Sequence, residues 1–345
     1  MIHNFYKKKN ILLTGFNGFK GSWMTLMLKV LGANVYGFAL NDKKNFEILN
    51  LKNHLKSYCF GNILNKKLLN QFTKKKKIDL SIHFAAESEV IKSYLSPFKA
   101  YEVNINGTLN ILKIIKDRKI PSLIATSDKC YLNLNNKNQI FNENSCLGGN
   151  DVYGASKAAQ EIIINPFIKT YNLKIVTSRS GNVIGGGEHN KLRIIPEIMH
   201  GIFKSGKIEL RNPSHTRPWQ HVLDVNYNYL KLLMKLYNDK DFSGAWNFGP
   251  SKSYSVEKIV LKFLKLNSNK KIRLIKKKNY YPGLESKFLQ ISSKKSKKFN
   301  FRNVYDLSKT VDITNDWYNE YFKKNKNMDL FTLNQIEKYF NEKNL

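Results

Sequence analysis

Five polar residues on two short segments of the chain are able to carry acid–base chemistry. Ser127, Asp128 and Lys129 are adjacent, so a hydroxyl, a carboxylate and an amine occupy consecutive positions. Tyr153 and Lys157 are four residues apart, a spacing that places two side chains on one face of a helix. A lysine ammonium beside a phenol lowers the phenol's pKa from about 10. We therefore expect Tyr153 to be a usable base near neutral pH.

Both groupings also have structural explanations. A tyrosine and a lysine at this spacing are common on exposed helices, and Ser127 could cap a helix whose charged neighbours are solvated. Its position favours a chemical role, because Ser127 follows an apolar run that ends at Thr126. Parallel sheets bind their ligands at the carboxyl ends of such strands.

A glycine pattern near the start of the chain indicates a dinucleotide site. Gly15, Gly18 and Gly21 lie between an apolar run (residues 11–14) and a helical pattern. Glycine permits the tight turn and lets the backbone approach a pyrophosphate at the helix N-terminus. An ordinary turn is the alternative, and the strand–turn–helix context favours the dinucleotide.

The next two predicted strands bear on which dinucleotide binds. An acidic residue that holds the adenosine ribose usually follows the second strand. Here Asp42 follows it, beside Lys43 and Lys44. Asp42 favours NAD, whereas the lysines suit a 2′-phosphate, so the sequence leaves this choice open. Asn62 and Ile63 are candidates for contact with the adenine, or simply a polar loop.

Alternating strands and helices must position these groups. Apolar runs of strand length at 11–14, 34–40, 80–85 and 122–126 alternate with helical patterns. This rhythm predicts an α/β fold with a doubly wound parallel Rossmann sheet. We expect an NAD-binding Rossmann domain over residues 1–182, to which the chain returns at about 222–250. A smaller mixed α/β C-terminal substrate lobe is expected from residues 183–221 and 251–345.

The composition excludes several classes of protein. A chain of 345 residues that is 42% hydrophobic has ample length for a core and is not a disordered chain. The three cysteines match no metal-ligand pattern, so we expect a reduced setting and no metal site. No apolar run reaches membrane-spanning length, and the one after the basic N-terminus is too short for a signal peptide. We expect a cytoplasmic protein with no membrane partner.

The net charge of +32 raises the question of nucleic-acid binding. Seven of the 58 basic residues are arginine and the rest are lysine, in short runs without regular aromatic interleaving. We favour a solvated lysine surface, which could attract an anionic substrate. We expect no nucleic-acid partner, although a basic nucleic-acid-binding protein with a degenerate Rossmann fold stays as an alternative from another class.

These motifs together resemble the extended short-chain dehydrogenase/reductase superfamily and, within it, the CDP-glucose 4,6-dehydratase family. The resemblance covers nearly the whole chain, and its most discriminating strings are GFKGSW and RPWQHV. The strings that carry it are GFKGSW (18–23), TSDKCY (126–131), LGGNDVYGASK (147–157), RSGNVIGGGE (179–188), RNPSHTRPWQHV (211–222), GAWNFGP (244–250) and TLNQIEKYF (332–340). Lys129 stands where many dTDP-glucose dehydratases carry glutamate, which favours the CDP-glucose branch.

The resemblance implies an intramolecular oxidation, elimination and reduction of the sugar, which gives CDP-4-keto-6-deoxyglucose. Tyr153 would take the proton of the sugar 4-hydroxyl, Ser127 would hydrogen-bond that hydroxyl, and Lys157 would hold the cofactor ribose. Water would leave across C5 and C6, with Asp128 as the acid and Lys129 as the C5 base. The division of labour between Asp128 and Lys129 is a hypothesis.

The resemblance also implies binding residues for the cofactor, NAD, and for a nucleotide-diphospho-hexose, with CDP-glucose as the first choice. Arginine suits the diphosphate, because its planar guanidinium makes paired hydrogen bonds that lysine cannot reproduce. For the cofactor the expected residues are Gly15, Asn17, Gly18, Phe19, Lys20, Gly21, Asp42, Asn62, Ile63, Ala85, Ala86, Tyr153 and Lys157. For the substrate they are Asn182, Arg193, Arg211, Arg217 and Gln220.

Two further expectations follow from the resemblance, and two residues depart from the family pattern. The pathway is deoxysugar supply for surface polysaccharide, and the assembly is a homodimer or a dimer of dimers. Pro166 speaks against a continuous active-site helix, which such dimers use, because proline breaks or kinks helices. Glu87 replaces a glutamine that is usual in the family. The nearest rivals are an epimerase or reductase of another nucleotide sugar and a dehydratase of a different one, and the Asp128–Lys129 pair argues against 4-epimerisation.

Overall fold

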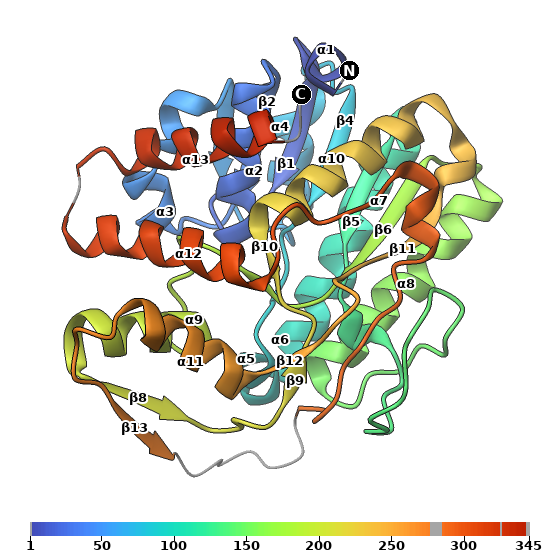
Figure 1. Ribbon diagram of the computed structural model, residues 1–345. Helices are drawn as coiled ribbons and strands as arrows, with labels where there is room; N and C mark the ends of the chain where they lie inside the picture. The colour runs from blue at the N-terminus through green and yellow to red at the C-terminus, as the bar shows by residue number, and fades with distance from the viewer. Residues whose placement is uncertain (1, 277–284, 325, 343–345) are drawn as a thin grey trace.

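Seven parallel strands form the central sheet, in the order β11-β6-β5-β4-β1-β2-β3 (Figure 1). The structure is a computed structural model that describes residues 2–276, 285–324 and 326–342. The strands of this sheet are β1 (Asn10–Thr14), β2 (Asn34–Ala39), β3 (Ser57–Phe60), β4 (Leu80–His83), β5 (Ser122–Ala125), β6 (Ile175–Ser180) and β11 (Gly244–Phe248). The doubly wound α/β fold predicted from the sequence is confirmed, since the chain crosses from β3 to β4 and so reverses direction along the sheet.

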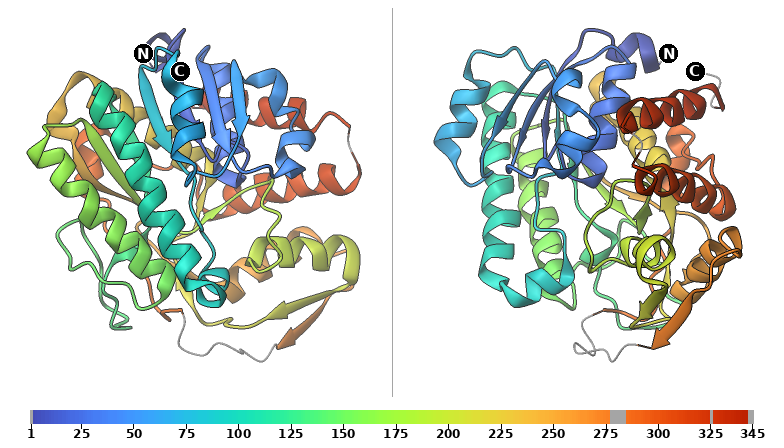
Figure 2. Two further views of the ribbon diagram at one scale, coloured as in Figure 1. Left: turned by 180° about the vertical axis from the view of Figure 1, so that it is seen from behind. Right: turned by 90° about the vertical axis from the view of Figure 1, so that its left-hand side faces the viewer.

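Helices cover both faces of the sheet (Figure 2). One face carries α4 (Lys66–Lys74), α7 (Gly107–Arg118) and α8 (Val152–Thr170), which lie side by side seen from behind. The amphipathic sequence of α4 explains its place, because Leu69 and Phe72 are buried while its lysines face outward. Shorter elements here are α5 (Val90–Leu95), α6 (Pro97–Tyr101), η2 (Glu102–Asn106) and η3 (Asp128–Cys130).

The opposite face carries α2 (Phe19–Val30) and α10 (Val222–Asn238). Most of α10 is buried, because it packs against α2 and β6 on one side and lies under C-terminal segments on the other. Two of these segments are α12 (Leu307–Phe322) and α13 (Met328–Glu342), and α13 packs on α2. Other short helices are α1 (Ile2–Tyr6), α3 (Lys43–Ile48), η1 (Leu51–His54), η5 (Lys240–Phe242) and η6 (Lys295–Phe299).

A smaller mixed lobe lies beyond the carboxyl ends of the central strands (Figure 1). Its helices are α9 (Ile194–His200), η4 (Gly201–Ser205) and α11 (Val256–Leu266). Its short strands are β7 (Val183–Ile184) with β10 (Gln220–His221), β8 (Lys207–Leu210) with β13 (Arg273–Lys276), and β9 (Thr216–Arg217) with β12 (Tyr254–Ser255). The chain rejoins the sheet at β11, whereas α13 packs on α2 rather than on this lobe. The division into two domains at the predicted boundaries stays a prediction.

No helix within the described parts of the chain is long and apolar enough to cross a membrane.

Candidate active site

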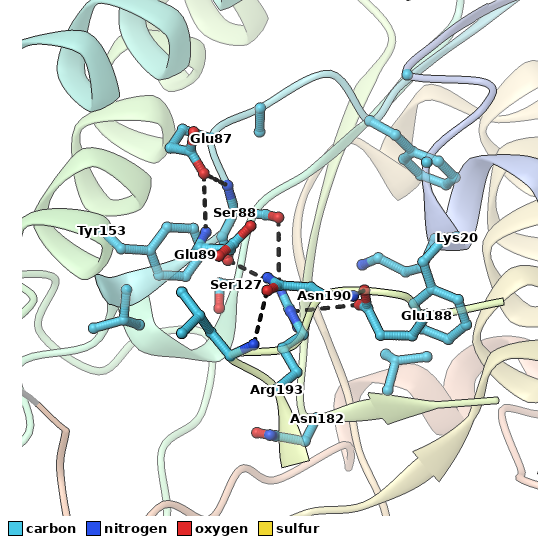
Figure 3. Close-up of a pocket in the computed structure, with 18 of the residues that line it drawn as sticks. Lys20, Glu87, Ser88, Glu89, Ser127, Tyr153, Asn182, Glu188, Asn190 and Arg193 are labelled. Carbon is cyan, nitrogen blue, oxygen red and sulfur yellow. Dashed lines mark hydrogen bonds and ion pairs between the residues drawn. The ribbon is translucent and has the colours of Figure 1, made fainter. Parts of the chain in front are cut away.

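A cavity of about 750 Å³ lies between the carboxyl edge of the sheet and the smaller lobe. The loops that follow β1, β4, β5 and β6 line one side of it, and segments of the lobe line the other. This is where parallel sheets bind ligands, because the helix N-termini and the strand ends meet there. Figure 3 shows Tyr153, Ser127 and Arg193 gathered in this cavity with acidic residues of two loops.

The glycine turn after β1 is packed so closely that two of its glycines are fixed by sterics. A Cβ on Gly21 would lie 1.9 Å from the carbonyl oxygen of Gly15, and one on Gly15 would lie 2.8 Å from the nitrogen of Ala85. Gly15 also has φ +70°, which favours glycine. A Cβ on Gly18 would meet only the Gly15 oxygen, at 3.5 Å, so the space in front of Gly18 opens into the cavity. The turn therefore fits a pyrophosphate laid against the N-terminus of α2.

The far end of the cavity fits an adenosine. The Asn17 amide donates to the carbonyl oxygens of Leu40 and Asp42, both at 2.8 Å, which ties the glycine turn to the loop after β2. One carboxylate oxygen of Asp42 caps α3 through the Lys44 nitrogen at 3.1 Å. Several predicted cofactor residues line this part of the same cavity, namely Phe19, Lys20, Asp42, Asn62, Ile63, Ala85 and Ala86.

Asp128 is a buried carboxyl at the start of η3. Its Oδ1 accepts a hydrogen bond from the Ser127 hydroxyl at 3.1 Å, and Ser127 also accepts from the Lys129 nitrogen at 3.2 Å. Its Oδ2 is buried and has no hydrogen-bond partner among the described residues. Burial raises the pKa of Asp128 to about 6, against the opposing charge of Lys129. The cavity therefore contains a carboxyl group that is able to donate a proton at mildly acidic to neutral pH.

Tyr153 and Lys157 lie on the first turns of α8, whose N-terminus is capped by Asp151 through the Gly154 nitrogen at 2.9 Å. The Lys157 ammonium lies 5.9 Å from the centre of the Tyr153 ring and donates to the carbonyl oxygen of Ala125 at 3.3 Å. Burial lowers the pKa of Lys157 to about 7.

The pKa of the Tyr153 phenol differs from the sequence-based expectation. Burial raises the pKa of Tyr153 to about 12, although a hydrogen bond with Ser127 and the charge of Arg193 oppose the rise. The expected lowering by Lys157 is wrong for the ligand-free chain, because burial outweighs every opposing charge. Burial also favours the uncharged form of Lys157, which further weakens its effect on the phenol.

Three of the predicted substrate arginines line the cavity from the lobe side. Arg193 donates to the Ser88 carbonyl oxygen at 2.9 Å and pairs with Glu188 at 3.4 Å (Figure 3). Arg217 is buried and pairs with Glu285 at 3.4 Å. Arg211 donates to the carbonyl oxygen of a neighbouring loop, that of Leu192, at 2.6 Å.

The sequence as a whole matches known sugar-nucleotide enzymes. Residues 12–321 match the family described as GDP-mannose 4,6 dehydratase. The chain is 32% identical over 340 residues to the CDP-glucose 4,6-dehydratase of Salmonella typhimurium, a match that covers 93% of each protein. It belongs to the family of nucleotide-sugar 4,6-dehydratases. As a member of this family the chain is a hydro-lyase, in agreement with the resemblance seen in its motifs.

Solved structures agree with the fold of the dehydratase. The dTDP-glucose 4,6-dehydratase of Bacillus anthracis, solved in complex with NAD, superposes with a TM-score of 0.77 at 23% identity and covers 93% of this chain and 98% of its own. An epimerase of Methanothermobacter thermautotrophicus superposes with a TM-score of 0.82 at 21% identity, with 94% and 98% covered. The same fold therefore serves both dehydratases and epimerases.

Two predicted site residues of the dehydratase do not line the cavity. Gln220 is buried, and its amide donates to the carbonyl oxygen of Phe248 at 2.8 Å, so it bridges β10 to the end of β11. Lys157 is buried, and its ammonium donates to the carbonyl oxygen of Ala125. Asn182, by contrast, lines the cavity as predicted.

Other residues have structural roles. Arg179 pairs with Glu161 at 2.9 Å inside the core, so this arginine has a structural role. His83 is buried next to Thr14 at 2.7 Å, and burial lowers its pKa to about 3, so it is a neutral core histidine. The described parts of the chain contain no group of three or more His, Cys, Asp or Glu side chains placed to hold a metal ion.

The two departures from the family pattern have local consequences. One Glu87 carboxylate oxygen accepts from the backbone nitrogens of Ser88 and Glu89, at 3.1 and 3.3 Å, so this side chain is held against its own loop. Helix α8 continues through Pro166 to Thr170, so the expected break in the active-site helix is wrong.

Sequence reasoning missed the acidic residues of the cavity. Glu285 pairs with both Lys129 and Arg217, and Glu188 pairs with Arg193. Glu285 comes from a segment far from the catalytic motifs, and no local pattern distinguishes it from a solvated glutamate. Glu188 is the last residue of the string RSGNVIGGGE, so its place in that string was the available signal.

Proposed function

We propose that this dehydratase converts CDP-glucose to CDP-4-keto-6-deoxyglucose with NAD as its cofactor. The observation that carries the proposal is the meeting of Ser127, Asp128, Lys129 and Tyr153 in one cavity, beside a glycine turn with open space at Gly18. The relative from Salmonella typhimurium, a CDP-glucose 4,6-dehydratase, supports the choice of CDP-glucose.

The cofactor would bind with its pyrophosphate against Gly18 and its adenosine toward Asp42 and Asn62. NAD supplies a hydride acceptor that later returns the same hydride, so the reaction has no net redox change. Asp42 favours NAD, because its carboxylate lines the cavity and would repel a 2′-phosphate. Lys157 would hold the nicotinamide-side ribose from behind Ala125.

Tyr153 and Ser127 would act on the sugar 4-hydroxyl. Ser127 hydrogen-bonds Tyr153 and opposes the rise of the Tyr153 pKa, so a proton can pass between the two side chains. Burial holds the pKa of the phenol at about 12 even with the positive charge of Arg193 acting on it, so the phenolate needs stabilisation beyond Ser127 and Arg193.

Asp128 and Lys129 would carry out the elimination of water. A 4-ketone acidifies the C5 hydrogen, so a base at C5 and an acid at the 6-hydroxyl suffice. Asp128 suits the acid, because it holds its proton up to a pH of about 6 and no described residue hydrogen-bonds its Oδ2. Lys129 is then the C5 base, and its adjacent position in the chain brings both groups to one end of the sugar.

The diphosphate would bind arginines of the smaller lobe. Arg217, Arg193 and Arg211 line the cavity, with Asn182 as a nearby polar contact. Gln220 is withdrawn from this role, since its amide is bonded to Phe248. We retain the two-domain reading, in which residues 1–182 bind the cofactor and the lobe binds the sugar nucleotide.

We also propose that two copies of the chain associate through α5, α6 and α8. These helices pack together and expose Leu95 (62%), Phe98 (88%) and Ile162 (60%), three large apolar side chains on one side of the molecule. The continuity of α8 removes the objection from Pro166. Light scattering should give a dimer or a dimer of dimers, and Phe98→Asp should shift the mass to the monomer.

The setting we propose is cytoplasmic, in the supply of deoxysugars for surface polysaccharide. An epimerase is the second candidate, because similar folds include epimerases. The buried carboxyl at Asp128 favours the dehydratase, since 4-epimerisation eliminates no water.

The deciding experiment is to incubate the protein and NAD with CDP-glucose, dTDP-glucose, UDP-glucose or GDP-mannose and to follow the products by mass spectrometry. We expect loss of one water from CDP-glucose without accumulation of reduced cofactor. Loss of water from a different substrate would keep the chemistry and change the nucleotide. A product of unchanged mass and inverted C4 would establish the epimerase instead.

A further inference from the structure

Glu285 connects two groups that act on different parts of the proposed substrate. Its Oε1 lies 3.3 Å from the Lys129 ammonium and its Oε2 lies 3.4 Å from the Arg217 guanidinium. The charges of Lys129 and Arg217 lower the pKa of Glu285 to about 2, so the carboxylate is ionised at every physiological pH. The bridge that Glu285 forms between Lys129 and Arg217 therefore consists of two ion pairs.

The bridge engages a guanidinium nitrogen of Arg217 that the substrate diphosphate would need. Arg217 is the most buried of the proposed diphosphate ligands. One terminal guanidinium nitrogen, Nη1, donates to the backbone carbonyl oxygens of Thr216 and Lys287. The other terminal nitrogen, Nη2, is paired with Glu285. A diphosphate oxygen that approaches Arg217 must therefore compete with this carboxylate, which has the same sign of charge.

The bridge also opposes the proposed work of Lys129. The ion pair holds the Lys129 ammonium 3.3 Å from Glu285, so the lysine side chain must leave this partner before it reaches the sugar. The side chain of Glu285 is 41% exposed, so it has space to leave this position when an anion displaces it.

We propose that Glu285 is an internal counter-ion that the substrate diphosphate replaces, so that binding at Arg217 releases Lys129 from its ion pair. The inference rests on the proposed function, since it assigns the diphosphate to Arg217 and the C5 proton to Lys129. Glu285 acts through these two residues and is a positioning residue. It orients Lys129 through their ion pair and gives way when a nucleoside diphosphate arrives.

The test is the affinity of nucleoside diphosphates for Glu285→Gln, measured by calorimetry with CDP, dTDP, UDP and GDP at low salt. A competing charge is removed, so we expect binding about three- to tenfold tighter than wild type. Glu285→Asp, which keeps the charge, should stay near wild type, and Glu285→Ala should follow Glu285→Gln. Glu257→Gln removes an exposed charge from α11 of the same lobe and should change nothing.

A second readout separates this role from a merely structural one. For the sugar nucleotide that the enzyme dehydrates, KM should fall in Glu285→Gln by about the same factor as the dissociation constant of the diphosphate. The value of kcat should stay near that of wild type, because the bridge is already open once substrate is bound. Thermal unfolding of each variant checks that the fold is intact.

Unchanged or weaker diphosphate binding by Glu285→Gln would overturn the inference. Unchanged binding would mean that Glu285 does not compete with the diphosphate, and weaker binding would mean that Glu285 itself holds the nucleotide. The absence of binding by any of the four diphosphates to wild type and variant alike would also overturn it. These titrations need no turnover. A failure of the proposed function would appear separately, as a wild-type protein that binds a diphosphate yet dehydrates no sugar nucleotide.

Discussion

At the scale of single residues, the site depends on buried ionisable groups whose protonation differs from that of exposed side chains. Asp128 holds a proton more firmly than an ordinary carboxyl, and Lys157 holds one less firmly than an ordinary amine. Both shifts are caused first by burial. Burying a charged group of this kind costs stability, which indicates that these residues serve the chemistry of the site and do not stabilise the fold.

The first prediction concerns turnover by Asp128→Asn. The amide has nearly the shape of the carboxyl and cannot donate a proton to the departing 6-hydroxyl. We expect kcat to fall by about 10²–10⁴. The oxidation at C4 should survive, so reduced nicotinamide should accumulate and be visible by its absorbance. An inactive variant with no reduced cofactor would place Asp128 in the first step instead.

The second prediction concerns the stability of the same variant. The folded-state pKa of Asp128 is raised from 3.8 to about 6, so the folded chain binds more protons than the unfolded chain between these values. Wild type should therefore lose stability as pH rises through this window and remain at the lower value above it. Asp128→Asn should be the more stable protein at pH 8, by on the order of 1–3 kcal/mol, and the gap should close near pH 4. Denaturant unfolding at both pH values measures this, and a constant gap would contradict the raised pKa.

At the scale of secondary-structure elements, sequence patterns predicted the strands and helices well but not every local feature. The parallel sheet followed from short apolar runs that alternate with helical patterns, and the glycine turn followed from the spacing of Gly15, Gly18 and Gly21. The helix α8 did not, because its packing against α5, α6 and α7 tolerates Pro166, which local rules treat as a break. Glu285 was missed for a related reason, since its two partners come from distant parts of the chain.

The third prediction compares two glycines of the same turn. In Gly21→Ala the new methyl group would lie 1.9 Å from the Gly15 oxygen, so α2 must move and stability should fall by roughly 1–3 kcal/mol or more. In Gly18→Ala the contact is 3.5 Å, and stability should change by no more than about 1 kcal/mol. Gly18→Ala should nevertheless bind NAD at least about tenfold more weakly, because its methyl group fills the space for the pyrophosphate. Calorimetry with NAD checks this, and full affinity in folded Gly18→Ala would move the pyrophosphate elsewhere.

The fourth prediction concerns Pro166, which is exposed inside α8. Proline has no N–H to donate to the preceding turn, so Pro166→Ala restores one helical hydrogen bond. We expect an increase of about 1–3 kcal/mol in the free energy of unfolding. Exposed Lys169→Ala on the same helix serves as the control and should have little effect. A destabilised Pro166→Ala would mean that the proline shapes α8 for a contact outside this chain.

At the scale of the whole molecule, the net charge of +32 acts over a longer range than any single contact. Seven arginines stand among 58 basic residues, and three of those seven line the cavity. The lysine surface thus supplies a general positive field, while arginine is concentrated where paired hydrogen bonds matter. Sequence reasoning reached this distinction from residue counts, whereas the acidic side chains that balance the cavity emerged only from the fold.

The fifth prediction follows from that field. Salt screens attraction between an anionic substrate and the lysine surface, so kcat/KM should fall by about three- to tenfold from low salt to a few tenths molar. The value of kcat should change little, because the field acts on encounter rather than on the bound complex. An uncharged co-solute at equal osmolarity is the control. A kcat/KM that is independent of salt would show that the surface lysines do not steer the substrate.

The packing of α13 on α2 has a consequence for biosynthesis. The apolar side of α2 is translated early, yet α13, the helix that covers it, follows only after α10, β11 and α12 have been translated. Tyr339 of α13 also donates to Asp224 on α10, at 2.8 Å, so the late helix ties together segments made at different times. Until that contact forms, the nascent dinucleotide-binding half must carry an uncovered apolar face. Chaperone demand during synthesis should therefore depend on residues far from the catalytic loop.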